Sequence, residues 1–124
     1  MVSPSNHTIL TSAQRAASSG YTNYINGRSS RFALAVVYIT AQSGTTQTLD
    51  ITLLSSPVDP AIDDTKWRTV YQESQIKSSA FTGGAPWIFG GHVCEDWTGY
   101  LKVAYTVGGT GTPKLTFSIN LELK

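Results

Sequence analysis

Apolar and polar residues alternate without interruption along the last eleven positions of the chain, from Lys114 to Lys124. Successive side chains of a β-strand point to opposite faces of a sheet, so this alternation predicts a strand with one buried face. The apolar positions are Leu115, Phe117, Ile119, Leu121 and Leu123. The polar positions between them carry mostly hydroxyl and amide groups, which suit either water or a partner surface.

Strand patterns recur through the rest of the chain at short spacing. Residues 31–42 are apolar on both faces, as expected of a central strand that is covered on both sides. Further strands are predicted at residues 9–10, 21–25, 48–55, 67–73, 87–89 and 100–107. No stretch has a helical period, so we expect an all-β fold: an antiparallel β-sandwich, jelly-roll-like, with seven or eight strands.

Two turns suggest which strands are neighbours. The turn at residues 43–46 separates two strong strands, and the Gly-rich loop at 108–113 separates two more. Strands joined by so few residues often form antiparallel hairpins. We therefore expect one hairpin from residues 31–55 and a second from residues 100–124.

The length and the two termini suggest one compact domain with an arm. A chain of 124 residues is the size of a single domain. Residues 1–31 are rich in Ser, Asn and Gly, and we expect them to form a polar N-terminal arm with short strands, followed by a sandwich at residues 32–124. No signal peptide is expected at the N-terminus, and no apolar run is long enough to span a membrane.

The charge of the chain argues against nucleic-acid binding, and its composition leaves open whether the protein is part of an assembly. Charged residues make up 14% of the chain, with a net charge of +1. The nine Lys and Arg residues are scattered, so no basic stripe predicts nucleic-acid binding. The many Ser and Thr residues fit an assembled protein whose surface loses little hydration on contact. They fit a Thr-rich β protein equally well.

Residues 92–96, His-Val-Cys-Glu-Asp, form the one local cluster that could carry chemistry. His92 and Cys94 would point the same way from a strand and could bind a metal, but His7 is the only other histidine and no second cysteine exists. An activated cysteine nucleophile is a second interpretation, and a buried structural thiol is the third and simplest. Because too few further ligands are present and the buried thiol is the simplest interpretation, we expect no metal or other cofactor.

Acidic residues do not mark an active site. Asp59, Asp63 and Asp64 could approach a calcium ion, but aspartate beside proline is also ordinary turn chemistry. Glycoside hydrolysis would need Glu95 or Asp96 to face a second carboxylate across a cleft, and no such pair stands out. We therefore expect no enzymatic activity.

Three tryptophans, at positions 67, 87 and 97, are open to two interpretations. Tryptophan fills cores and oligomer interfaces. Exposed and coplanar with tyrosine, it could instead stack against sugar rings. The second interpretation makes a carbohydrate-binding or receptor-binding tail domain the alternative function.

The hairpin at residues 40–51, TAQSGTTQTLDI, is similar to one in small structural proteins of the capsid region of tailed bacteriophages. Those chains continue with an Asp-containing turn and a tryptophan, as at residues 63–67, DDTKW. They end with a Gly-Gly-Thr loop and a terminal strand, as at residues 107–110 and 115–119. The resemblance spans about residues 31–124.

The resemblance implies a virion component: a capsid decoration (cement) protein on the outer surface of the phage head. It implies binding to the major capsid protein and self-association, with a homotrimer favoured and a dimer possible, and it supplies no catalytic residues. Residues expected in self-association are Trp87, Ile88, Phe89 and Trp97. Residues expected to contact the capsid are Arg15, Arg28 and Arg31.

Overall fold

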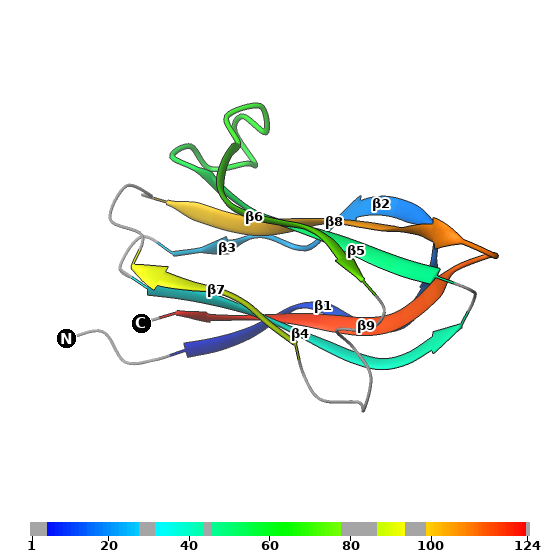
Figure 1. The fold of residues 1–124 in the computed structure, drawn as a ribbon. Coiled ribbons are helices and arrows are strands. Elements are labelled where there is room, and N and C mark those ends of the chain that lie inside the picture. Colours follow the sequence, from blue (N-terminus) through cyan, green and yellow to red (C-terminus); the bar gives the residue numbers. More distant parts are fainter. Residues whose placement is uncertain (1–4, 28–31, 44–45, 78–86, 94–98, 124) are drawn as a thin grey trace.

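The computed structural model describes residues 5–27, 32–43, 46–77, 87–93 and 99–123 (Figure 1). The described strands are β1 (Ser5–Ala16), β2 (Ser18–Tyr21), β3 (Ile25–Asn26), β4 (Phe32–Ser43), β5 (Thr46–Ser56), β6 (Arg68–Lys77), β7 (Trp87–Val93), β8 (Tyr100–Thr110) and β9 (Lys114–Leu123). In this part of the chain no helix has the length and apolar character needed to cross a membrane.

The strands form two antiparallel sheets that face each other (Figure 1). One sheet has the order β1-β9-β4-β7, and the other has the order β2-β8-β5-β6, with β3 also pairing with β8. Since β2 and β3 lie one after the other along β8, they act as one interrupted strand. Two four-stranded sheets with this interleaved order form a jelly roll, so the predicted fold class is confirmed.

The prediction of both hairpins is wrong, because neither pair of consecutive strands is hydrogen-bonded together. β4 pairs with β9 and β7, whereas β5, which follows it after a short turn, pairs with β8 and β6 in the other sheet. β8 and β9, which are also joined by a short loop, likewise belong to different sheets. A short turn shows that the chain reverses, but it permits the next strand to cross to the facing sheet as readily as to pair with its predecessor.

The N-terminal segment also differs from the arm expected at residues 1–31. β1 pairs along the whole of β9, from Ser5 opposite Leu123 to Ala16 opposite Lys114, and β2 and β3 pair with β8. Its polar composition has a physical reason, because β1 and β2 are edge strands. One edge and one face of such a strand meet water, so few apolar residues are needed.

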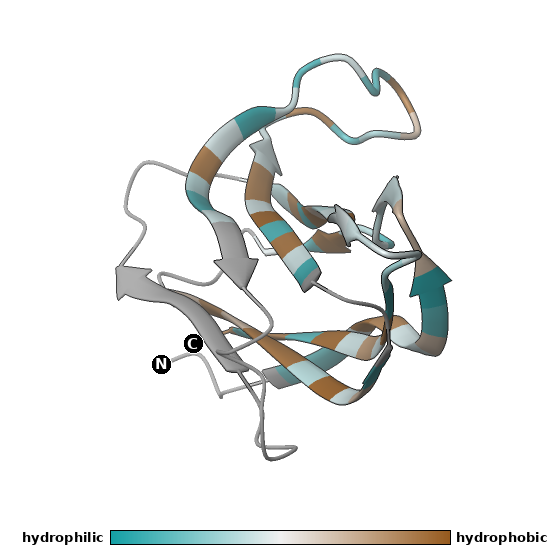
Figure 2. Ribbon diagram, turned by 45° about the vertical axis from the view of Figure 1, so that its right-hand side comes forward, coloured by the Kyte–Doolittle hydropathy of each residue, from teal (hydrophilic) through white to brown (hydrophobic). Residues whose placement is uncertain are grey.

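The core lies between the sheets and is formed by inward-facing residues of both. Figure 2 shows hydrophobic and hydrophilic residues alternating along the strands that enclose it. Burial along β9 alternates as the sequence predicted, with every apolar residue from Leu115 to Leu123 buried. On β4 the inward residues are the small or β-branched ones. The core residues are Ile9, Ala33, Ala35, Val37, Ile39, Leu49, Ile51, Leu53, Leu101, Val103, Val107, Leu115, Phe117, Ile119, Leu121 and Leu123.

The Thr22 side chain supplies a hydrogen bond where the strand is interrupted between β2 and β3. Thr22 lies in the gap and donates its backbone N–H to the Val103 carbonyl, at 2.9 Å. Its hydroxyl oxygen accepts the Val103 N–H, also at 2.9 Å, in a buried bond. The hydroxyl thus replaces the backbone carbonyl that a continuous ladder would supply.

Replacing Thr22 with valine is expected to lower the free energy of unfolding by about 1–3 kcal/mol, because it leaves the buried Val103 N–H without an acceptor. Urea denaturation measures the loss. Thr22→Ser is the matched control, since it keeps the hydroxyl and should recover most of the stability. Equal stability of the valine and serine variants would show that the hydrogen bond contributes nothing.

Candidate interaction surface

The loop of residues 57–67, between β5 and β6, stands over the outer face of the β2-β8-β5-β6 sheet (Figure 1). Its turn is internally bonded: the amides of Ile62 and Asp63 donate to the Asp59 carbonyl at 2.8 and 3.0 Å, and the Ala61 amide donates to Asp59 Oδ1 at 2.9 Å. The Thr65 amide donates to Asp63 Oδ1 at 2.9 Å. This loop is therefore held in one shape by its own aspartates.

Electrostatics in the loop follow from these bonds. The hydroxyl and amide of Thr65 hold the pKa of the Asp63 carboxyl below its ordinary value, because both stabilise the charged form. Lys66 lies 4.0 Å from the same carboxylate. The contacts of Asp59 and Asp63 are those of turn chemistry, the simpler of the two interpretations of these aspartates.

Lys102 attaches the loop to the sheet. It points outward from β8 between buried neighbours, and its Nζ lies 4.2 Å from the Tyr21 ring centroid and 4.3 Å from that of Trp67. Asp64 Oδ1 lies 4.0 Å from Nζ and accepts the Trp67 indole N–H at 2.6 Å. The Lys102 side chain is only 12% exposed, which strengthens its attraction to the rings and the carboxylate.

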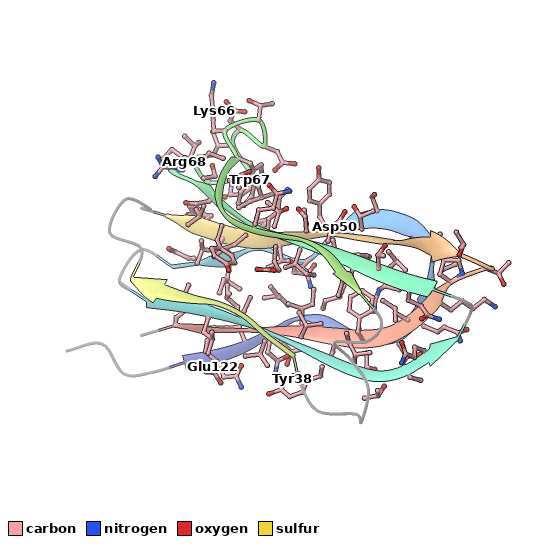
Figure 3. The ribbon with its side chains drawn as sticks, in the orientation of Figure 1. Tyr38, Asp50, Lys66, Trp67, Arg68 and Glu122 are labelled. Carbon is pink, nitrogen blue, oxygen red and sulfur yellow. The ribbon has the colours of Figure 1, made fainter. Side chains whose placement is uncertain are left out.

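We call the outer face of the β2-β8-β5-β6 sheet, together with loop 57–67, the loop face. Figure 3 shows Trp67, Lys66 and Asp50 on this side of the sandwich. Beside Lys102 on β8, Tyr100 meets Tyr24 edge to face, with ring centroids 5.9 Å apart and planes at 78°. The loop face thus carries two aromatic groups: Tyr21 and Trp67 around Lys102, and the Tyr24–Tyr100 pair.

On the opposite face, formed by the β1-β9-β4-β7 sheet, β9 presents polar side chains. Thr116, Ser118 and Asn120 of β9 point outward and are half-buried. Tyr38 of β4 lies on the same side, as Figure 3 shows together with Glu122. Its exposed fraction is 36%, lower than those of Tyr21, Tyr24 and Ile62.

Ring geometry bears on the carbohydrate-binding alternative, which requires coplanar exposed rings. Among the described residues, Tyr24 meets Tyr100 at 78° and Tyr105 meets Phe117 at 82°, so both pairs are edge to face. Trp67 is half-buried and directs its ring towards the Lys102 ammonium. These pairs do not form a flat platform.

Arg15, expected at the capsid contact, is extensively bonded within its own chain. Its guanidinium donates to the carbonyls of Thr11, Ala13 and Phe117 at 2.9, 3.0 and 2.7 Å. It also lies over the Phe117 ring, 4.7 Å from the centroid, and 5.7 Å from that of Tyr105. It therefore joins β1 to residues of both sheets, and its role at a capsid stays a prediction.

The other predicted site residues are less fully described. Trp87, Ile88 and Phe89 begin β7, the edge strand that pairs with β4. Trp97, Arg28 and Arg31 lie outside the described residues. Of the candidate cluster, His92 belongs to β7, and Cys94, Glu95 and Asp96 lie outside the described residues.

The grouping of Tyr21, Trp67 and Lys102 was not predicted from the sequence. The three residues come from three distant segments, and no spacing rule links them. A partial signal existed, because alternation in residues 100–107 already places Lys102 on the outward face. Its partners are set by the order of strands within the sheet.

Comparisons with known proteins identify the fold. No protein-family model matches the chain, and no curated protein is similar to it in sequence. The structure of infectious bursal disease virus, Gx strain, aligns with a TM-score of 0.63 and 11% identity, and that of its VP2 subviral particle with 0.62 and 13%. Each alignment covers 98% of this chain, and the chain spans 32% of each matched chain.

The likeness to these viral capsid proteins extends over nearly the whole chain and concerns its fold. Both matched proteins come from a virus that is not a tailed phage. The comparison therefore does not support the narrower resemblance to tailed-phage decoration proteins. The chain has a viral capsid-type jelly-roll fold.

Proposed function

We propose that this chain is a structural protein of a virion, and more narrowly a decoration protein on the head of a tailed bacteriophage. The observation that carries the proposal is the jelly-roll fold, which aligns over 98% of the chain with a viral capsid protein at a TM-score of 0.63. The resemblance of residues 31–124 to small phage capsid-region proteins supplies the narrower part. The chain acts without catalysis, through protein–protein contacts alone.

The mechanism is binding to one state of the head. A protein that binds the assembled shell, but not its separated subunits, stabilises the shell by mass action. Its partners are the major capsid protein and other copies of itself, with a homotrimer favoured over a dimer. The internally bonded loop 57–67 supports this mechanism, because a rigid contact surface loses less conformational entropy on binding.

Purified heads of the virus that encodes the chain, prepared without it, provide the test. We expect the chain to sediment with these heads at saturable stoichiometry and to raise their disruption temperature. Separated capsid subunits are the control and should bind much more weakly. Analytical ultracentrifugation of the chain alone should give the mass of a trimer. A monomer that neither binds the heads nor stabilises them would refute the proposal.

A further inference from the structure

Several exposed apolar side chains lie on the loop face. Among the residues whose side chains the structure describes, which excludes residues 75–77 and 87–93, four large hydrophobic ones are exposed: Ile62 at 81%, Tyr21 at 65%, Tyr24 at 45% and Tyr38 at 36%. Tyr21 contacts Lys102 and Tyr24 contacts Tyr100, both through outward residues of β8. Ile62 belongs to loop 57–67, which stands over the same face. The three most exposed of the four therefore share one side of the sandwich.

The loop presents Ile62 in a fixed position. The turn that carries Ile62 is closed by two bonds to the Asp59 carbonyl and one to the Asp59 carboxylate. Beyond Ile62, the contacts of Asp64 and Trp67 with Lys102 fasten the loop to β8. An aliphatic side chain held in this way is already ordered before it meets a partner, which is what makes an effective anchor.

The charges of the loop indicate which groups a binding partner would present around the Ile62 side chain. Asp63 and Asp64 each have a lysine Nζ at 4.0 Å, so their charges are balanced within the chain. Asp59 has no cation within ion-pair distance among the described residues. Its carboxylate lies beside the turn that carries Ile62. A complementary surface therefore needs a cationic group next to an apolar pocket.

We infer that the loop face is the surface with which this chain docks on the capsid, with Ile62 inserted in an apolar pocket and Asp59 opposite a lysine or arginine of the capsid protein. Tyr21 and Tyr24 extend the contact along β8. The inference rests on the proposed function and specifies its surface. The β1-β9-β4-β7 sheet stays outside this contact.

Binding of single variants to the same purified heads tests the surface. Ile62→Asp is expected to weaken binding about thirtyfold or more, the effect of losing a central anchor, whereas Ile62→Leu should bind within about threefold of the native chain. Asp59→Asn keeps the oxygen that accepts the Ala61 N–H and removes the charge, so it should weaken binding mainly at low salt. Tyr38→Ser, on the opposite face, is the matched control and should bind normally.

The outcomes separate the surface from the function. If the native chain binds heads and Ile62→Asp binds equally well, the loop face is not the docking surface, although the decoration function stands. Loss of binding in Tyr38→Ser alone would move the contact to the opposite sheet. A native chain that does not bind heads at all would refute the function and this inference together. If the chain binds a glycan array, and replacing Tyr21 and Tyr24 abolishes that binding, the loop face would be a carbohydrate-binding surface instead.

Discussion

Replacing Phe117 with alanine is expected to lower the free energy of unfolding by about 3–5 kcal/mol. Phe117 is fully buried in β9, and Tyr105 of the facing sheet meets its ring edge to face at 5.5 Å. The Arg15 guanidinium lies over the same ring and donates to the Phe117 carbonyl at 2.7 Å. Truncation therefore leaves a cavity between the sheets and removes the surface on which Arg15 rests.

Urea denaturation followed by circular dichroism measures this loss, with the slope of the transition checking that unfolding remains two-state. Phe117→Leu retains most of the volume and should lose clearly less stability than alanine. A double-mutant cycle with Arg15→Met isolates the contact between the two residues and should give a coupling of at least about 0.5 kcal/mol. A loss below about 1 kcal/mol in Phe117→Ala would contradict the packing described.

Gly99→Ala is the second substitution with a large expected effect. Gly99 has a φ of +116°, a conformation that residues with a Cβ rarely adopt. A Cβ at this position would lie 2.5 Å from the carbonyl oxygen of Ser56, which is backbone at the buried end of β5. Strain alone costs about 1–3 kcal/mol, and relief of the contact must also displace β5 or the start of β8.

Thermal unfolding of Gly99→Ala should show a decrease of about 4 °C or more for each kcal/mol lost. The matched control is Gly111→Asn. Gly111 has a φ of +70°, near the left-handed region that asparagine tolerates, and is exposed in the turn before β9. We expect it to change stability by less than about 1 kcal/mol. Equal melting temperatures for Gly99→Ala and the native chain would contradict the packing of Gly99 against β5.

The two sheets illustrate how far strand patterns can be extended to topology. The expected strand at residues 100–107 corresponds to β8, and the inward residues Leu101, Val103 and Val107 are buried. Alternation is a local property, so it can be identified without knowing any neighbour. The partners of β8 are β2, β3 and β5, which are distant in sequence, and no local pattern specifies them.

Residues of the candidate surface were even harder to predict from local patterns, because they come from distant segments. Asp59 and Asp63 are turn-forming residues, and their local bonds follow from sequence chemistry. Lys102 between Tyr21 and Trp67 depends on β8 lying beside β2 and beneath loop 57–67. Three segments separated by tens of residues must be placed before the cluster exists.

Local sequence patterns are enough to predict that this protein is built of strands, which faces of β8 and β9 are buried, and that turns occur near residues 43–46 and 108–113. These properties follow from a side-chain period of two and from local turn chemistry. The fold as a whole sets which strands are neighbours: β4 and β5 belong to different sheets, and β1 pairs with β9. It also places Tyr21 and Tyr24 beside outward residues of β8, on the face over which the loop that carries Ile62 stands. Such choices depend on which distant surfaces pack best together, and that free energy belongs to the whole sandwich rather than to any segment.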